Sequence, residues 1–280
     1  MPELPEVETV RRALAPVLEG RILARAVARR PDLRFPLPED FGQRLTGRTV
    51  RKVGRRAKYL LVELDDGTTL ICHLGMSGSF RIYENDGPVL AKHEHVILTT
   101  DQGVEIRYND PRRFGFMLLA EADQLASHAL LRDIGPEPLG ADFNASVLAF
   151  ALKGRNSPIK MALLDQSVVA GLGNIYVSEA LFQAGISPKR KAATIAGGRA
   201  EKLYQAIVDV LRRALAAGGS SINDHRQPSG ELGYFQHSFG VYGRTGEACS
   251  GCDCDIACTG GIRRIQQAGR STFYCTKRQR

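Results

Sequence analysis

A short segment rich in proline and glycine divides this chain into two halves with different hydrophobic periodicity. The segment is GPEPLG at residues 135–140, and such a density of backbone-restricting and backbone-freeing residues interrupts helices and strands alike. Apolar residues follow mainly a strand-like pattern before it and recur at helical spacing after it. The sequence therefore predicts two domains joined by a linker over 135–145, which suits a length of 280 residues.

The first half combines one helix with many short strands. Apolar residues repeat at helical spacing from Leu4 to Leu18, and Gly20 favours an end to that helix. The turn sequences DDG at 65–67 and DQG at 101–103 separate neighbouring β-rich runs. The predicted strands are 59–64, 68–74, 79–83, 95–100, 104–108 and 116–120. This pattern is typical of an antiparallel β-sandwich flanked by helices, here over residues 1–134.

The second half is helical up to a small cysteine-bearing module. The periodicity predicts helices over 146–153, 157–169, 174–184 and 198–217, with Ser157 as an N-cap before Pro158. We expect a helical domain over 146–235, followed by a hairpin module over 236–280. The whole chain is thus expected to be an α+β protein.

Five of the six cysteines lie near the C-terminus, at positions 249, 252, 254, 258 and 275. In a chain without a secretory signal this clustering favours a metal site over disulfides. The pair Cys249 and Cys252 has one zinc-ribbon spacing, and the interval from Cys258 to Cys275 has another. A second C-x2-C pair would need a cysteine at position 278, where the chain has Arg278. A structural zinc and a metal-free hairpin both remain open.

The charge balance favours a polyanionic partner, because 38 Lys and Arg against 30 Asp and Glu give a net charge of +8 and a pI near 9.3. Basic residues form short runs that border turns and could reach phosphates, although a solvated surface explains them equally well. The runs lie at 51–56, 189–191, 263–264 and 277–280. Charges in the first twenty residues exclude a signal peptide, and no apolar stretch predicts a membrane span. We expect a cytoplasmic protein.

The first residues can supply a nucleophile. The small Pro2 favours removal of Met1, which leaves a secondary amine beside Glu3 and Glu6. A terminal amine has an ordinary pKa near 8, so part of it is neutral at physiological pH and able to attack a carbonyl-like carbon. The alternative is a purely structural helix start, with proline in the first turn and acids favouring the helix dipole. Lys58 can likewise be either a surface charge or a functional residue, and its position in the sequence does not decide between them.

Several common catalytic motifs are absent or incomplete. The GLGNIY segment at 171–176 lacks the third glycine of a dinucleotide fingerprint, and helices flank it on both sides. GMSG at 75–78 does not have the spacing of a nucleophile elbow, and no phosphate-binding P-loop occurs. We expect no nucleotide cofactor. A Gly-x-Gly turn between helices instead resembles a helix-turn-helix variant that presents backbone N–H groups to an anion, although a simple helix C-cap is the commoner explanation.

Six ordered segments resemble the formamidopyrimidine-DNA glycosylase family. They are PELPEVET at 2–9, RAKYL at 56–60, HLGMSG at 73–78, DPRRFG at 110–115, GLGNIY at 171–176 and GRSTFYC at 269–275. The opening segment and GELGYFQ at 230–236 look more like the branch that acts on oxidised purines. The resemblance implies a helix-two-turn-helix domain, a zinc hairpin and a monomer. It also implies a bifunctional glycosylase and AP lyase that removes 8-oxoguanine and formamidopyrimidines from duplex DNA.

The resemblance also assigns roles to individual residues. It implies that Pro2 attacks C1′ of the damaged nucleotide, that Glu3 is the general acid, and that Lys58 and Arg270 assist strand cleavage. The residues that would fill the space left by an extruded base are Met76, Arg112 and Phe114. Those that would contact the DNA backbone are His93, Arg155 and Asn174. Glu6 and the loop at 222–236 would line the pocket for the damaged base.

The metal module is where the chain departs from the family pattern. Cys258 and Cys275 match ligand positions best, and the other two ligands come from Cys249, Cys252 and Cys254. We take Cys249, Cys254, Cys258 and Cys275 as the expected ligands of one structural zinc.

Two other functions compete with this interpretation. One is a DNA-binding module without catalysis, whose cysteine tail has drifted. The other keeps the chemistry but acts on oxidised pyrimidines.

Overall fold

The computed structural model describes residues 1–84, 87–220, 228, 233–253 and 255–280. The chain forms two compact units, which are described separately below. The first contains Met1–Arg132 and Ala217–Tyr234, and the second contains Asp133–Ala216 and Phe235–Arg280. The first boundary lies close to the predicted end of the N-terminal domain. The segment from 217 to 234, which we expected in the helical domain, groups with the first unit instead.

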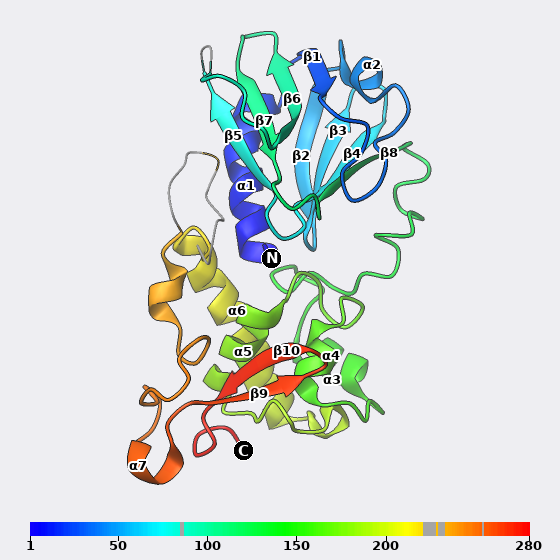
Figure 1. Ribbon diagram of the computed structural model, residues 1–280. Coiled ribbons are helices and arrows are strands. Elements are labelled where there is room, and N and C mark those ends of the chain that lie inside the picture. Colours follow the sequence, from blue (N-terminus) through cyan, green and yellow to red (C-terminus); the bar gives the residue numbers. More distant parts are fainter. Residues whose placement is uncertain (85–86, 221–227, 229–232, 254) are drawn as a thin grey trace. The chain divides into compact units, whose positions relative to one another are not determined.

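The first unit contains two antiparallel four-stranded sheets and a long helix, α1 (Leu4–Leu18) (Figure 1). One sheet has the order β1-β6-β7-β5 and the other β2-β3-β4-β8. The strands are β1 (Leu23–Ala28), β2 (Val50–Arg56), β3 (Tyr59–Leu64), β4 (Thr69–His73), β5 (Ser79–Tyr83), β6 (Glu94–Thr100), β7 (Glu105–Asn109) and β8 (Phe116–Ala120). Buried side chains of both sheets and α1 form one hydrophobic core, which makes this unit a β-sandwich with a helix packed on it.

Hydrophobic alternation explains why most of these strands were predictable. In β3 buried and partly exposed residues alternate along the whole strand, whereas every residue of β4 but the last is buried between β3 and β8. All six predicted strands are confirmed to within one residue at each end. The prediction missed β1, β2 and the short helix α2 (Phe41–Leu45). Both strands contain a register shift and exposed basic residues, which break the period of two.

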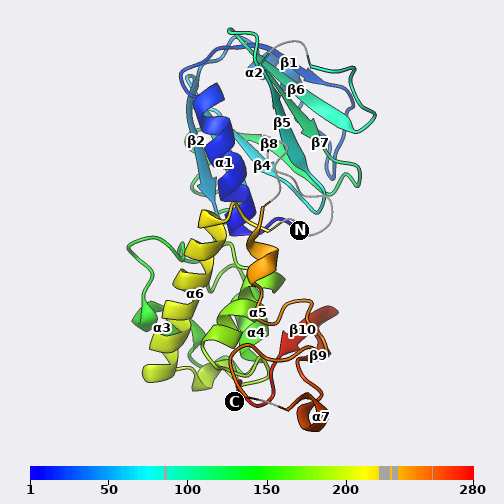
Figure 2. The same cartoon turned by 90° about the vertical axis from the view of Figure 1, so that its left-hand side faces the viewer.

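The second unit is helical. Its longer helices are α3 (Ala145–Leu152), α4 (Ile159–Leu164), α5 (Asn174–Gln183) and α6 (Gly198–Ala216), with α5 and α6 side by side (Figure 2). The short elements are η1 (Ala192–Thr194), η2 (Phe235–Ser238) and α7 (Ile256–Thr259). Strands β9 (Arg263–Gln267) and β10 (Arg270–Tyr274) form an antiparallel hairpin. In the part of the chain that the structure describes, no helix combines the length and the apolar character needed to cross a bilayer.

Helix α4 is shorter than its sequence pattern predicts. Its N-cap is Pro158 rather than Ser157, and it ends at Leu164 rather than near Val169. The Asp165 carboxylate accepts hydrogen bonds from the backbone N and the hydroxyl of Ser167, at 3.0 and 2.7 Å. Such a local turn competes with helical hydrogen bonding. The apolar residues that follow are buried in the connection to α5 instead of extending the helix.

Candidate functional site

The residues that follow Met1 are buried within the first unit, whereas Met1 itself is 50% exposed. Pro2 is buried and Glu3 is only 3% exposed. The backbone N of Glu3 donates to Oε2 of Glu6 at 2.9 Å, and Oε1 of Glu6 accepts from the backbone N and the hydroxyl of Ser220 at 2.8 and 2.9 Å. These bonds fix the start of α1, so the end of the chain has a defined position beside two carboxylates.

The environment favours a neutral terminal amine. Burial lowers the pKa of the Met1 α-amino group, the residue before Pro2, below its usual value near 8, and the positive charges of Lys58 and Arg112 lower it further, while Glu3 and Glu6 act in the opposite direction. Lys58 is itself buried, in the turn between β2 and β3 where Ala57 has a φ of +50°. A neutral amine is the nucleophilic form. The structure thus brings four of the predicted residues, Glu3, Glu6, Lys58 and Arg112, around the amino terminus.

His73 lies near Lys58 and is a neutral aromatic side chain at physiological pH. Its ring stacks on Phe116 with centroids 5.1 Å apart, and its Nδ1 accepts a hydrogen bond from the backbone N of Gly75 at 3.1 Å. Burial, followed by the charges of Lys58 and Arg34, lowers the pKa of His73 from 6.5 to about 4. His73 therefore adds no positive charge near Lys58 at neutral pH.

The low pKa of His73 predicts a loss of stability in acid. The pKa of His73 is 6.5 in the unfolded state and about 4 in the folded state, so between these pH values only the unfolded state is protonated at this residue. The free energy of unfolding therefore falls as the pH falls. Urea unfolding of the wild type and of His73→Asn, which keeps the acceptor but does not titrate, isolates the effect. The stability of the wild type relative to the variant should fall by about 2 kcal/mol from pH 7 to pH 5. A difference that does not change with pH would contradict this assignment.

Three predicted DNA-contact residues lie on two neighbouring loops of the first unit. Met76 and Phe114 are 44% and 43% exposed, which is unusual for large apolar side chains. The guanidinium of Arg112 lies 4.8 Å above the ring of Phe114. The pair therefore offers an apolar surface and a cation at the same place.

Asp110 is completely buried, and its carboxylate forms hydrogen bonds to both of these loops. Its Oδ1 accepts from the Ser77 hydroxyl at 2.5 Å, and its Oδ2 accepts from the backbone N of Gly115 at 2.8 Å. The Ser77 oxygen also accepts from the backbone N of Arg112 at 3.2 Å. A side chain at Gly115 would collide with the Tyr108 hydroxyl, so only glycine fits there. Asp110 and Ser77 lie within the segments DPRRFG and HLGMSG, but their positions in the sequence predicted no role for them.

The main chain of Asp110 is also hydrogen-bonded to His93, which the family resemblance predicts to contact the DNA backbone. The backbone N of Asp110 donates to the carbonyl oxygen of His93 at 3.0 Å, and Nε2 of His95 lies 3.0 Å from the carbonyl oxygen of Asp110. His93 is partly exposed. One buried residue therefore sets the positions of the Met76 loop, the Arg112 loop and His93.

In the second unit, buried polar side chains anchor the hairpin that carries Arg270. Nζ of Lys160 donates to the carbonyl oxygen of Ser271 at 2.8 Å and to the hydroxyl of Thr272 at 2.7 Å. Nδ2 of Asn174 donates to the same Ser271 carbonyl at 3.0 Å. Lys160 is completely buried, and the sequence analysis missed it. A lysine inside the apolar helical segment IKMALL was the available signal.

Arg270 and Arg155 remain accessible. Arg270 is exposed and directly follows a two-residue turn, where Ala268 and Gly269 have φ values of +46° and +75°. Two successive positive φ values fit a type I′ turn. Arg155 is partly exposed and contacts the carboxylate of Asp165 at 2.8 Å. Both guanidinium groups are placed where phosphates can reach them.

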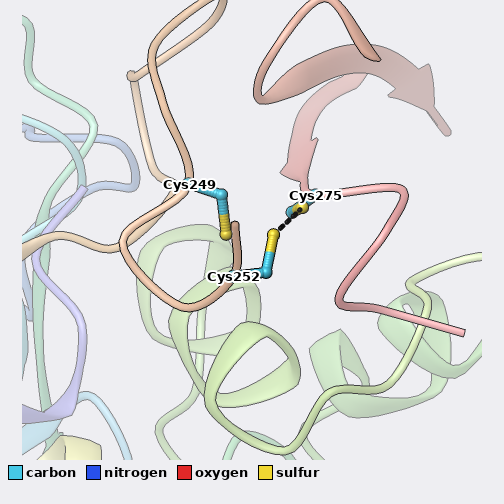
Figure 3. Close-up of side chains that lie close together, drawn as sticks. All are labelled: Cys249, Cys252 and Cys275. Carbon is cyan, nitrogen blue, oxygen red and sulfur yellow. Dashed lines mark hydrogen bonds between the residues drawn. The ribbon is translucent and has the colours of Figure 1, made fainter. Parts of the chain in front are cut away.

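Three cysteines of the second unit form a cluster (Figure 3). The sulfur atoms of Cys249, Cys252 and Cys275 all lie within 4.8 Å of one another, and those of Cys252 and Cys275 are 3.6 Å apart. Backbone N–H groups of Gly251 and Arg278 donate to Sγ of Cys249 and of Cys275, at 3.4 and 3.5 Å. Tetrahedral zinc with bonds of about 2.3 Å requires sulfurs roughly 3.8 Å apart, so these three thiols fit three corners of such a site.

The predicted ligand set agrees with this cluster only in part. Cys249 and Cys275 belong to it, and Cys252 occupies the place we had left among alternatives. Cys258 is exposed and its thiol donates to Oδ2 of Asp255 at 3.2 Å, so the structure does not bring it to the cluster. Cys254 lies outside the described residues, as do 222–227 and 229–232 of the loop expected to line the base pocket. Among the described residues, no fourth Cys, His or carboxylate joins the three thiols.

Sequence and structure comparisons define the class of protein. Residues 1–117 match the formamidopyrimidine-DNA glycosylase N-terminal domain, and residues 134–226 match the formamidopyrimidine-DNA glycosylase H2TH domain. A two-domain chain of this kind, with a buried Pro2 near its amino terminus and an H2TH domain, is a DNA glycosylase of base-excision repair.

The full-length relatives identify the family. Formamidopyrimidine-DNA glycosylases of Rhodospirillum rubrum and Azorhizobium caulinodans are both 57% identical to this chain, each over 100% of both chains. The wild-type Lactococcus lactis Fpg (MutM), solved with DNA containing N7-benzyl-Fapy-dG, is 38% identical with a TM-score of 0.89 over 100% of both chains. MutM in complex with carbocyclic 8-oxo-G DNA is 37% identical with a TM-score of 0.88 over the same coverage. The chain belongs to the formamidopyrimidine-DNA glycosylase family.

Proposed function

We propose that this protein removes 8-oxoguanine and formamidopyrimidines from duplex DNA through a Schiff base on Pro2, and then cleaves the strand by β,δ-elimination. The observation that carries the proposal is the buried Pro2 beside the buried Glu3, Glu6 and Lys58, at a place where burial lowers the pKa of the preceding Met1 α-amino group. The relatives solved with Fapy-dG and 8-oxo-G DNA support the choice of lesion. Because its substrate is the chromosome, we place the protein in the cytoplasm.

Base removal begins once Met1 has been cleaved off. The neutral nitrogen of Pro2 attacks C1′, and the bond from C1′ to the base nitrogen breaks with its electrons on the base. The nitrogen gives up its proton, which the departing base takes up, and the nitrogen lone pair then forms a C=N⁺ bond as the bond from C1′ to O4′ breaks. Glu3 supplies the proton that O4′ takes up, which is the role of a general acid held within reach of the sugar. Glu6, fixed by Ser220, lines the pocket for the base.

Strand cleavage follows from the iminium ion. Loss of a proton from C2′ expels the 3′ phosphate, and loss of a further proton from C4′ expels the 5′ phosphate. Lys58 acts as a cation and proton donor during elimination. Arg270 holds phosphate and assists the second elimination, and the bonds from Lys160 and Asn174 keep its hairpin in place.

Access to the base requires its extrusion, which costs a few kcal/mol. Met76 and Phe114 enter the vacated space, and Arg112 pairs with the orphaned base through its guanidinium donors. His93, Arg155 and Asn174 bind the DNA backbone. Cys249, Cys252 and Cys275 would hold a structural zinc, for which thiolates are suitable ligands. No reaction step depends on the metal.

Replacing Asp110, which supports the loops of Met76 and Phe114, should slow extrusion of the damaged base more than it slows strand cleavage. In Asp110→Asn the amide presents N–H to one of the donors that the carboxylate now accepts from, so the two loops lose part of their shared support. We expect 8-oxoguanine excision to fall about 10- to 100-fold, the effect of one charged hydrogen bond of 1.5–3 kcal/mol. Cleavage of a duplex with a preformed abasic site should fall far less, since no base has to be extruded. Equal losses on both duplexes would count against a role in extrusion.

Oxidised pyrimidines are the second candidate substrate. One observation favours them: wild-type Lactococcus lactis Fpg (MutM), 37% identical with a TM-score of 0.88, was solved with DNA containing an oxidised pyrimidine. Parallel single-turnover assays on 8-oxoguanine and thymine-glycol duplexes separate the two. Faster excision of thymine glycol would overturn our assignment. Equal affinity for damaged and undamaged duplex, with no covalent adduct, would favour a module that only binds DNA.

A further inference from the structure

Arg278 occupies the position where a second C-x2-C pair would place a metal ligand, and its side chain makes an unusual set of contacts. Nη1 donates to the carbonyl oxygen of Gly251 at 2.7 Å, within the turn between Cys249 and Cys252. Nε donates to the carbonyl oxygen of Phe182 at 3.1 Å, and Nη2 to that of Gln183 at 3.3 Å. One guanidinium therefore connects the cysteine turn to the C-terminal end of α5.

The packing around this guanidinium is close. Its central carbon lies 5.0 Å from the centre of the Phe182 ring. A Cβ on Gly251 would approach the Arg278 side chain to 2.8 Å, so glycine leaves the space that the arginine fills. The Phe182 carbonyl also accepts from the backbone N of Gly185 at 3.1 Å, so Arg278 adds a second donor there and supplies a donor to the Gln183 carbonyl. A cation is favoured at a helix C-terminus.

The main chain at Arg278 and the side chain of Gln279 also connect the Cys275 turn to the residues that follow α5. The backbone N of Arg278 donates to Sγ of Cys275 at 3.5 Å. The next residue, Gln279, accepts from the backbone N of Cys275 at 2.8 Å and donates to the carbonyl oxygen of Ile186 at 3.0 Å. A small apolar core that includes Phe182, Cys249 and Cys275 lies beside these bonds. Both halves of the cysteine module are therefore attached to the end of α5 by protein contacts.

We propose that Arg278 replaces a fourth metal–thiolate bond as the link between the Cys249–Cys252 turn and the Cys275 turn, so that the β9–β10 hairpin keeps its position when the metal is removed. In a site with four protein ligands, the metal is the link between the two turns, and its removal unfolds small modules of this kind. Here the guanidinium contacts are independent of metal. This proposal concerns the hairpin's support, and it does not depend on which lesion the protein excises.

Hydrogen exchange of the full-length protein with and without a zinc chelator tests the proposal. In the wild type, chelation should change the protection of the β9–β10 amides less than about 3-fold. In Arg278→Ala, chelation should lower that protection at least 10-fold. Amides of β3 and β4 in the first unit serve as the internal control for folding, and Arg278→Lys, which keeps the charge but loses the fork of donors, should lie between the two.

Metal content gives a second readout without DNA. Arg278→Cys offers a fourth thiolate at this position, so it should release zinc to a chromogenic chelator at least 10-fold more slowly than the wild type, and its hairpin should lose protection once the zinc is gone. If the wild-type hairpin loses protection on chelation as fully as Arg278→Ala does, the metal is the link and the proposal is wrong. It is equally wrong if chelation leaves the hairpin of Arg278→Ala protected. Failure of glycosylase activity would leave both measurements unaffected.

Discussion

A chain that carries one extra glycine ahead of Pro2 is expected to form no covalent complex with damaged DNA when borohydride is added. The extension turns the nitrogen of Pro2 into a tertiary amide, whose lone pair is delocalised and cannot attack C1′. The new terminal amine takes the place of the Met1 amine, on a residue that is 50% exposed, and not the buried place of the Pro2 nitrogen. Trapping of 8-oxoguanine duplex should fall at least 10³-fold, on the order of the loss of a nucleophile.

Two controls make this result specific to the nucleophile. Pro2→Gly keeps a free α-amine at the same position, so it should still be trapped, at an altered rate. The extended chain should bind a duplex with an unreactive abasic analogue within about 3-fold of the wild type, because the DNA-contact loops are unchanged. Trapping of the extended chain at the wild-type level would rule out Pro2 as the nucleophile.

The second large effect is expected for Glu3→Gln. The amide keeps the shape of the side chain but has no proton to give to O4′, and a positioned general acid contributes about 10²- to 10⁴-fold to a rate. Excision of 8-oxoguanine under single-turnover conditions should fall by that factor. Cleavage at a preformed abasic site, where the sugar already opens without enzyme, should retain a larger share of its rate.

Glu8→Gln is the matched control for this substitution. Glu8 lies on the same helix and pairs with Arg11, Arg12 and Arg55 on its surface, away from the amino terminus. We expect excision by Glu8→Gln within about 3-fold of the wild type. If Glu3→Gln excises 8-oxoguanine as fast as Glu8→Gln does, Glu3 is not the general acid.

Local patterns made much of the fold predictable. Strands β3 to β8 and helices α1, α3, α5 and α6 have clear periodicity and turn residues at their ends, and each was placed to within two residues. The misses have local causes that periodicity does not detect. Basic residues and bulges hide β1 and β2, and the Asp165 turn ends α4 early although apolar residues continue.

The site was less predictable, because its supports come from distant parts of the chain. Asp110 bonds to Ser77, and Glu6 bonds to Ser220, over separations that no spacing rule detects. The same holds for Lys160 and Thr272. The family resemblance points to the residues with chemistry, whereas the residues that hold them in place appear only in the folded chain. Counting cysteines could not choose Cys252 over Cys258 either, since both intervals suit zinc.

The most direct test of the account is borohydride trapping of the wild-type protein with a duplex that carries 8-oxoguanine opposite cytosine, followed by mass spectrometry of the adduct. The account predicts a covalent complex in which the sugar remnant is attached to the α-nitrogen of Pro2, from a chain that has lost Met1. An adduct on Lys58 or another lysine, or no adduct from a chain that begins at Pro2, would contradict it.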